Sequence, residues 1–199
     1  MEQIDYQMHA WDAVTRLQET LRFLDDAVRN GKIAYYGFSN FPRLAIDQGR
    51  TRSECQRLHT ARDLQPQDSL LVREIESEIV PACVDANIGL LPWSPLAGGW
   101  LTGKYQRDAD PTGATRLGED PKRGMEAWEP RNKQERTWRI FDAIEEIASA
   151  NGVNQGQVSL AWLEARPAVT LLILGCAAPT TSAPPRSSSP PTSSSASMR

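Results

Sequence analysis

The chain alternates short apolar runs with segments of helical periodicity, and this alternation limits its fold more than any other feature. Strand-like apolar runs occupy residues 4–9, 33–39, 88–92 and 169–174. Apolar residues with helical spacing occupy residues 15–31, 72–87, 132–151 and 155–166. A strand–helix–strand order is typical of a parallel sheet with right-handed crossovers. The sequence therefore predicts an α/β fold.

Composition excludes several classes of protein. The 199 residues carry 22 Lys and Arg against 25 Asp and Glu, a net charge of −3, which leaves no basic stripe for a nucleic acid. No window approaches the roughly 18 apolar residues of a membrane span. The N-terminus lacks the regions of a secretory signal. Three widely spaced cysteines, Cys55, Cys83 and Cys176, suit a reducing compartment. We expect a cytoplasmic protein with no nucleic acid and no membrane partner.

The composition changes abruptly near residue 175. Residues 176–199 are rich in Ser, Thr and Pro and contain no aromatic residue, so they cannot bury enough apolar surface to offset chain entropy. We therefore expect an ordered domain over residues 1–175 and a disordered tail over residues 176–199. A natural tail and a shifted reading frame explain this change equally well.

Two internal stretches depart from the alternation. Residues 43–63 carry eight charged side chains and show little periodicity where a helix is due. Residues 106–131 are rich in Pro, Gly and charge. The second stretch predicts a long surface loop, a kind of segment that is often functional.

The segment after the apolar run 88–92 is the strongest candidate for a binding site. Ligands of parallel sheets and barrels bind at the carboxyl ends of strands. There Trp93 can stack on a flat heterocycle, Ser94 and the small residues after it let backbone amides approach a phosphate, and Lys104 can neutralise it. An ordinary Gly/Pro loop with a packed tryptophan explains the same residues. A P-loop is disfavoured, because Tyr105 stands where a Ser or Thr is needed to hold magnesium.

Two other strand exits carry polar side chains. His9 ends the first run, where an imidazole can hydrogen-bond a substrate carbonyl. Ser39 and Asn40 end the second and can bind a carboxamide as donor and acceptor together. Taken singly, such residues are more often turn or capping residues. Three polar exits at one end of a barrel instead indicate a shared site. Cys55 and His59 lack a further ligand of useful spacing, so we interpret them as an incidental pair and expect no metal.

Eight short blocks of sequence occur in an order that is typical of one family. They span residues 4–9, 31–33, 36–41, 64–67, 92–99, 101–105, 161–163 and 166–170. Together they resemble the aldo/keto reductase family, particularly its bacterial and potassium-channel β-subunit-like branch, over residues 3–175. The resemblance implies a (β/α)₈ TIM barrel that uses NADP(H) to reduce a small-molecule aldehyde or ketone. This chain would match the last five β/α units, an incomplete barrel.

The resemblance also implies roles for individual residues. His9 would orient the substrate carbonyl, and Trp93 would stack on the nicotinamide ring. The other cofactor-binding residues that it implies are Ser39, Asn40 and Gln65 at the carboxamide, Ser94, Pro95, Leu96, Ala97 and Gly98 along the pyrophosphate, Lys104 and Arg116 as basic anchors, and Gly175 at the last strand exit.

Departures from the family limit what we expect of the chain. The units that would supply the catalytic Asp, Tyr and Lys would precede Ile4, so the sequence reads as truncated and only His9 remains of the four catalytic positions. Cys176 and the tail replace the residues that hold the 2′-phosphate, and Asp68 stands where the branch usually has Tyr. Five strands cannot close an eight-stranded barrel. We expect open edges, exposed apolar inward-facing side chains, self-association and no turnover by the chain alone.

Two functions of different classes stay open. The first is an NADP-dependent aldo/keto reductase, an oxidoreductase by descent that transfers hydride to a carbonyl. The second is a non-catalytic module that binds a nucleotide or a protein, with an inactive gene fragment as its limiting case.

Overall fold

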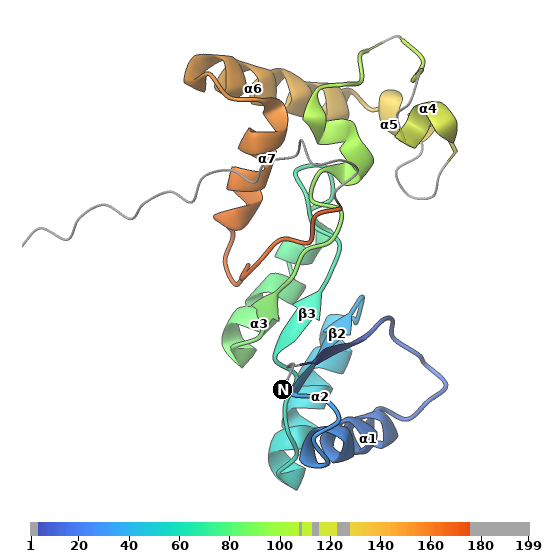
Figure 1. Ribbon diagram of the computed structural model, residues 1–199, viewed down its shortest axis with the longest axis vertical. Helices are drawn as coiled ribbons and strands as arrows, with labels where there is room; N and C mark the ends of the chain where they lie inside the picture. The colour runs from blue at the N-terminus through green and yellow to red at the C-terminus, as the bar shows by residue number, and fades with distance from the viewer. Residues whose placement is uncertain (1–3, 108, 113–115, 123–127, 176–199) are drawn as a thin grey trace, which may run out of the picture.

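A parallel sheet lies at the centre of the first half of the chain. The computed structural model describes residues 4–107, 109–112, 116–122 and 128–175. The strands β1 (Asp5–Met8), β2 (Tyr35–Ser39), β3 (Asp63–Gln65) and β4 (Gly89–Leu90) are all parallel and lie in this order. The helices α1 (Leu17–Arg29), α2 (Arg43–Gln56) and α3 (Ile79–Ala86) alternate with them (Figure 1). The predicted α/β architecture with a parallel sheet is confirmed.

One face of the sheet forms the main core. Successive side chains of a strand point to opposite faces, so Tyr36 and Phe38 of β2 share a face with Leu64 of β3, which Phe38 pairs with. The three helices cover this face. The buried residues of the core are Leu17, Leu21, Leu24, Tyr36, Phe38, Phe41, Ala45, Ile46, Leu64, Cys83, Ile88 and Leu90.

The opposite face of the sheet is largely polar. The pairing places Asp5 and Gln7 of β1 on this face together with Asp63 and Gln65 of β3. The Nε2 amide of Gln7 donates to Asp63 Oδ1 and, at 3.1 Å, to Asp5 Oδ2. Gly37 lies between these strands and leaves room for the bond, since a Cβ there would lie 2.8 Å from Asp63 Cγ. We expected the inward-facing side chains of the strands to be apolar, but those on this face are largely polar.

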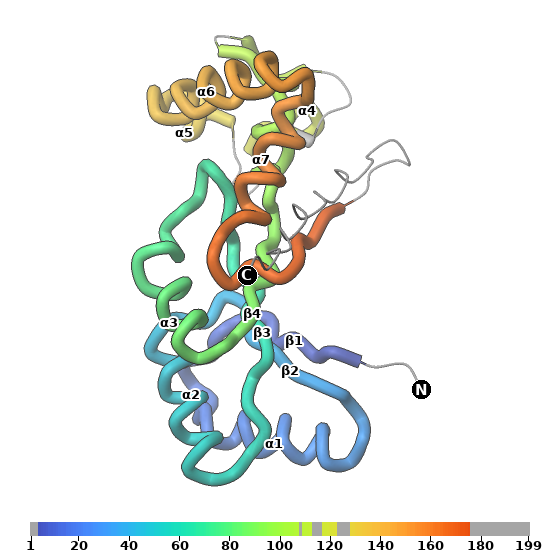
Figure 2. Tube along the Cα trace, turned by 90° about the vertical axis from the view of Figure 1, so that its left-hand side faces the viewer, coloured from blue at the N-terminus to red at the C-terminus, as the bar shows by residue number. Residues whose placement is uncertain are grey.

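The second half of the chain builds a separate core of aromatic residues. It contains η2 (Ala97–Thr102), α4 (Arg116–Glu119), α5 (Trp128–Asn132), α6 (Glu135–Asn151) and α7 (Gln155–Glu164). Trp100 is fully buried and stacks on Trp128, with 4.8 Å between ring centroids. The stretch expected to be a surface loop thus contains two short helices, and Leu117 and Trp128 of these helices are buried in this core. Figure 2 shows these helices grouped beyond the sheet.

Two helices differ from the sequence pattern. Helix α2 forms although its apolar periodicity is weak. The periodicity is weak because the residues that the helix buries are mostly small: Ala45, Ile46, Gly49 and Ser53. The helix expected over 72–87 is replaced by a 3₁₀ turn, η1 (Glu74–Glu76), and the shorter α3. Pro81 lies in the first turn of α3, where proline is tolerated, whereas it would break a longer helix in its interior.

The last apolar run, 169–174, lies beside β4 but does not form the expected strand. Val169 makes one parallel bridge with Leu90. The Thr170 amide donates to Leu90 O at 3.0 Å, and the Ile173 amide donates to Pro92 O at 3.1 Å. Leu171, Ile173 and Leu174 are exposed, so this segment gains little from burial. The tail that we expect to be disordered, 176–199, lies outside the described residues.

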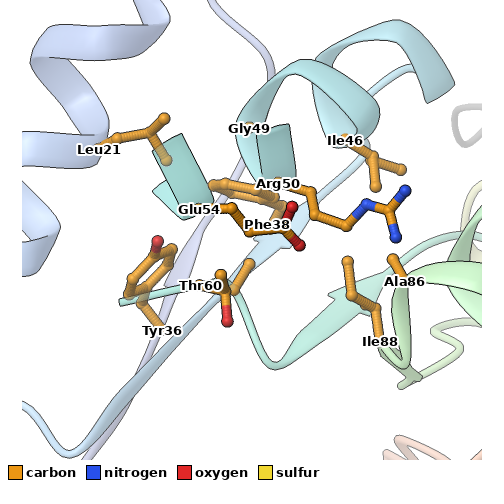
Figure 3. A pocket seen from close by; sticks show the side chains of 11 residues that line it. Leu21, Tyr36, Phe38, Ile46, Gly49, Arg50, Glu54, Thr60, Ala86 and Ile88 are labelled. Carbon is orange, nitrogen blue, oxygen red and sulfur yellow. The ribbon is translucent and has the colours of Figure 1, made fainter. Parts of the chain in front are cut away.

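A small cavity lies between α2 and the sheet, and Gly49 helps to create it. The cavity has a volume of about 60 Å³, and Phe38, Ile46 and Gly49 are among the residues that line it (Figure 3). A Cβ at Gly49 would make ordinary contact with Phe38, 3.6 Å from Cε2. The site therefore has room for a methyl group.

We predict that Gly49→Ala stabilises the chain by about 1 kcal/mol, because alanine favours a helix interior more than glycine and fills part of the cavity. Gly37→Ala makes the same chemical change and should destabilise the chain by about 1–3 kcal/mol, because its Cβ collides with the carboxyl group of Asp63. Urea unfolding of both variants measures the two effects. Shifts of the same sign would contradict this account.

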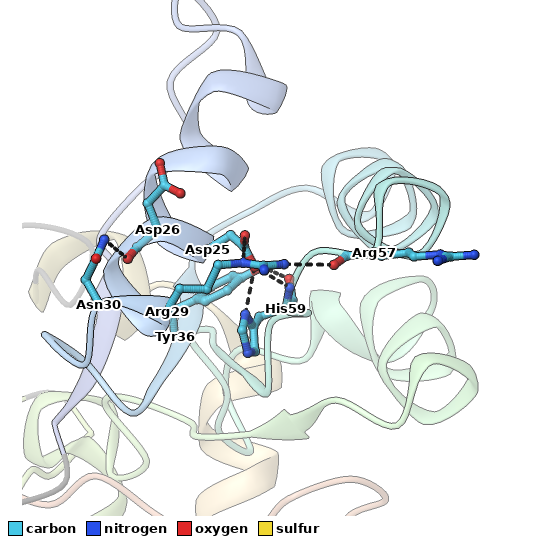
Figure 4. A network of polar contacts seen from close by, with 7 residues as sticks. All are labelled: Asp25, Asp26, Arg29, Asn30, Tyr36, Arg57 and His59. Carbon is cyan, nitrogen blue, oxygen red and sulfur yellow. Dashed lines mark hydrogen bonds and ion pairs between the residues drawn. The ribbon is translucent and has the colours of Figure 1, made fainter.

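A buried carboxylate ties α1 to the segment that follows α2. Asp25 is 3% exposed. It accepts hydrogen bonds from the backbone amide of His59 at 2.8 Å, from Nδ1 of the same residue at 2.7 Å and from Nε of Arg29 at 2.6 Å (Figure 4). Burial by itself raises the pKa of Asp25, but these hydrogen bonds from His59 and Arg29 outweigh it and hold the pKa below its usual value.

Asp25→Asn should lower the free energy of unfolding by about 1–3 kcal/mol, because it removes a charged acceptor of several hydrogen bonds. The folded-state pKa is depressed, so the wild-type contribution is present above the ordinary value of 3.8 and is lost as pH falls through the lower folded value. Chemical denaturation at neutral and acidic pH tests this loss. Asp26→Asn, at an exposed neighbouring position, is the matched control. An equal effect of both substitutions would exclude the network as the cause.

Candidate functional site

Side chains at the carboxyl ends of the strands form a connected set of hydrogen bonds. Asn40 Nδ2 donates to His9 O at 3.2 Å and to Ser39 Oγ at 3.0 Å. Ser39 Oγ donates to Gln65 O at 2.9 Å. Trp93 Nε1 donates to Asn40 Oδ1 at 3.1 Å. The structure thus brings these five sequence-predicted residues together, and we call them the rim.

Asn40 is the centre of the rim. Its φ of 54° lies in the left-handed region, which Asn tolerates better than most residues. Both hydrogens of its Nδ2 are engaged, by His9 O and by Ser39 Oγ. Its Oδ1 accepts from Trp93 and keeps a second lone pair. Ser39 is 1% exposed and already donates to Gln65, so only the acceptor side of Asn40 is left to meet a ligand amide.

The loop after Trp93 has a left-handed backbone at several positions. Ser94, Ala97, Gly98 and Gly99 have φ values of 57°, 48°, 66° and 99°. Tight turns close it, with Ala97 N donating to Ser94 O at 2.8 Å and Gly99 N to Leu96 O at 2.9 Å. Turn conformations can present backbone amides to an anion, and here the amides of Ala97 and Gly99 are already bonded within the loop. Pro95 and Ala97 are buried, which holds the loop in place.

Lys104 adds a positive charge to this loop. A Cβ placed at Gly99 would lie 2.6 Å from Lys104 Nζ, so the ammonium group lies directly against the glycine. Lys104 Nζ is also 5.4 Å from the centroid of the Tyr105 ring. Lys104 therefore places a positive charge beside the tightly turned loop 94–99.

The described residues leave the predicted roles of Arg116 and Gly175 untested. The backbone of Arg116 lies in α4, and its side chain is outside the described residues. Gly175 is exposed, and a Cβ there would meet nothing within 4 Å. Their proposed roles stay predictions from the family resemblance.

Sequence reasoning gave no role to Gln67 or Asp68. Gln67 forms a parallel backbone bridge with Trp93. Asp68 is 1% exposed, and burial raises its pKa to about 7, helped by the negative charge of Glu76. The only signal in the sequence was the acidic residue at a position where the branch usually has Tyr.

The described part of the chain shows neither a cluster of metal ligands nor a membrane-spanning helix. No three His, Cys, Asp or Glu side chains of these residues gather into a possible metal site. None of the helices that the structure describes is both long and apolar enough to cross a membrane.

Four parallel strands that alternate with helices define an α/β protein, and polar side chains gather at the carboxyl ends of its strands. Comparison with known proteins identifies the family. The family model for the Aldo/keto reductase family matches residues 1–181, and the chain belongs to this family. The chain is 29% identical over 161 residues to versiconal hemiacetal acetate reductase of Aspergillus parasiticus, covering 81% of this chain and 45% of the relative.

Other relatives agree with the branch and the fold. The chain is 32% identical over 173 residues to a probable voltage-gated potassium channel subunit beta of Oryza sativa subsp. japonica, covering 84% and 50% of the two chains. The solved structure of a glycerol dehydrogenase from Gluconobacter oxydans matches 85% of this chain and 48% of its own, with a TM-score of 0.66 and 25% identity. The chain spans about half the length of the relatives it matches. The predicted incomplete TIM barrel is confirmed.

We predict that Gly99→Ala weakens binding of inorganic pyrophosphate and that Gly152→Ala does not. Both glycines have positive φ, so each alanine should cost about 1 kcal/mol of stability. Only at Gly99 does the new methyl group displace Lys104, because nothing lies within 4 Å of a Cβ at Gly152. Urea unfolding and phosphorus NMR titration with pyrophosphate measure the two effects. Equal loss of binding in both variants would mean that backbone strain, and not Lys104, is responsible.

Proposed function

We propose that this chain binds the nicotinamide and pyrophosphate of NADP(H) and serves carbonyl reduction as part of an aldo/keto reductase barrel. The observation that carries the proposal is the hydrogen-bonded rim from His9 through Asn40 to Trp93, beside the loop 94–99. Family membership and the reductase among the relatives support the reaction class. The choice of NADP(H), a cytoplasmic location and an aldehyde or ketone substrate rest on the resemblance and the composition.

The described residues fit a dinucleotide of this kind. The indole of Trp93 is half-buried and its plane is held by the bond to Asn40 Oδ1, so it offers a fixed surface for stacking. The free lone pair of Asn40 Oδ1 suits the amide hydrogens of a carboxamide. Lys104 and the left-handed turns suit the pyrophosphate.

The chain's own residues would contribute binding and orientation. A reduced nicotinamide supplies a hydride when it is bound. His9 is exposed at the rim, and an N–H of its imidazole would donate a hydrogen bond to the substrate carbonyl oxygen. Trp93 would shield one face of the nicotinamide from water, and Lys104 would hold the pyrophosphate.

None of the chain's four tyrosines lies at the rim, where a general acid would be needed. Tyr36 donates its hydroxyl to His59 O at 2.6 Å within the main core, and Tyr105 is buried in the aromatic core. Tyr6 and Tyr35 lie near the amino ends of β1 and β2. The proton that a carbonyl requires on reduction therefore has to come from a group outside these four tyrosines. We infer that this chain, tested alone, binds the dinucleotide without turnover.

A non-catalytic nucleotide- or protein-binding module is the second candidate. The same placement of the tyrosines favours it, because a module needs the rim and no acid. The channel-subunit relatives add weight to it. Self-association through the edge of β1 and the segment beside β4 stays a prediction.

NADPH titration of the full chain tests the proposal. Binding should quench tryptophan fluorescence, and Trp93→Phe should remove most of the quench while keeping an aromatic face. Trp93→Leu should weaken binding about tenfold, because it loses a stacking contact worth about 1.4 kcal/mol. Trp162→Phe, on α7, is the control and should keep the quench.

Calorimetry gives the affinities, and NADPH oxidation with an added aldehyde gives the turnover. Binding without turnover supports nucleotide binding by the isolated chain and favours the non-catalytic module. Robust oxidation by the monomer would refute the inference about the missing acid. Absence of binding would favour the inactive gene fragment.

A further inference from the structure

Asp68 is a buried carboxyl group with an incomplete set of partners. It lies three residues after β3 and is 1% exposed. Its Oδ1 atom is buried and has no hydrogen-bond partner among the described residues. The turn after it is closed at both ends, with Ser69 N donating to Val72 O at 3.0 Å and Val72 N to Ser69 O at 3.1 Å. Asp68 is thus buried directly before a tight turn.

The backbone next to Asp68 also supports the rim. Trp93 N donates to Pro66 O at 2.9 Å, and Gln67 makes the parallel bridge with Trp93. Gln65 O accepts from Ser39 Oγ. A movement of residues 65–68 would therefore displace two rim residues, Gln65 and Trp93, together.

Charged groups from two elements act on Asp68. Arg73 donates to Glu76 of η1 at 2.7 and 2.9 Å, and its guanidinium lies 5.1 Å from the centroid of the Trp162 ring. Arg166, after α7, lies 4.7 Å from the same centroid. Burial, together with the negative charge of Glu76, raises the pKa of Asp68 to about 7, while the Ser69 amide, Arg73 and Arg166 oppose them. The two arginines thus flank the same indole ring, and the positive charge of both favours the ionised form of Asp68.

We propose that Asp68 is a positioning residue of the rim and that its ionisation couples the affinity for NADPH to pH; this inference rests on the proposed function. The neutral carboxyl group is accommodated in its dry site. The ionised group is a buried charge whose Oδ1 lacks a hydrogen bond, which is costly and draws Arg73 or Arg166 from its present partner. The turn then shifts with Gln65 and Trp93, and the rim binds more weakly.

The test compares NADPH affinity of the full chain with that of Asp68→Asn at about pH 6 and about pH 8. If only the protonated form binds, the apparent Kd of the wild type rises up to about tenfold over this range. Asp68→Asn should remove this rise. Asp63→Asn is the matched control, because Asp63 is another partly buried carboxyl group, with a pKa raised to about 6 chiefly by burial, at the start of β3 away from the rim. It should keep the wild-type dependence.

Ligand-free unfolding separates positioning from a loss of fold. The folded-state pKa of Asp68 is raised, so wild-type stability falls as pH rises from its ordinary value of 3.8 towards about 7. Asp68→Asn should remove this fall and be at least as stable as the wild type at about pH 8. A less stable variant at that pH would overturn the inference, as would identical pH profiles of affinity in the wild type and the variant. Absence of NADPH binding at every pH would instead overturn the proposed function, and the coupling with it.

Discussion

The parallel pairing of β2 with β3 decides which side chains of this chain can meet. Phe38 pairs with Leu64 on the helix-covered face, and Ser39 pairs with Gln65 on the other. Burial of the first pair fixes the register, because a slip of one residue would turn Phe38 away from the core. The rim therefore depends on the core: Asn40 reaches both His9 and Trp93 only because the strands end level with one another.

The sequence predicted the elements in which apolar residues recur with a clear period. Helix α1 buries Leu17, Leu21 and Leu24 at helical spacing, and its stop at Gly31 matches a φ of 68°. The rim was predictable for a similar reason, because strand exits are visible in sequence and exits of parallel strands share one edge. Helix α2 was not predictable from periodicity, since Gly49 and Ser53 carry too little apolar surface to mark its buried side.

The inner face of the sheet shows where an expectation from the family differed from this chain. Asp5 and Gln7 alternate with Tyr6 and Met8 in β1, a period of two that indicates opposite chemistries on opposite faces. The bond from Gln7 to Asp63 then depends on the absence of a side chain at Gly37. A contact between residues 56 positions apart has no local signal. Only the register of three strands, taken together, reveals it.

In the proposed function, binding and proton donation have different structural requirements, and the described residues would serve the first of them. Each rim residue is placed by a strand exit or by the turn that follows it, and a single core fixes these strands. Part of a barrel is therefore enough to hold the rim. A hydroxyl that donates to the same carbonyl has to enter from another direction. The described strands direct Tyr36 into the core and begin with Tyr35 at the far edge. The separation of binding from proton donation thus follows from the direction of the strands, because their carboxyl ends gather the rim residues while their tyrosines lie elsewhere.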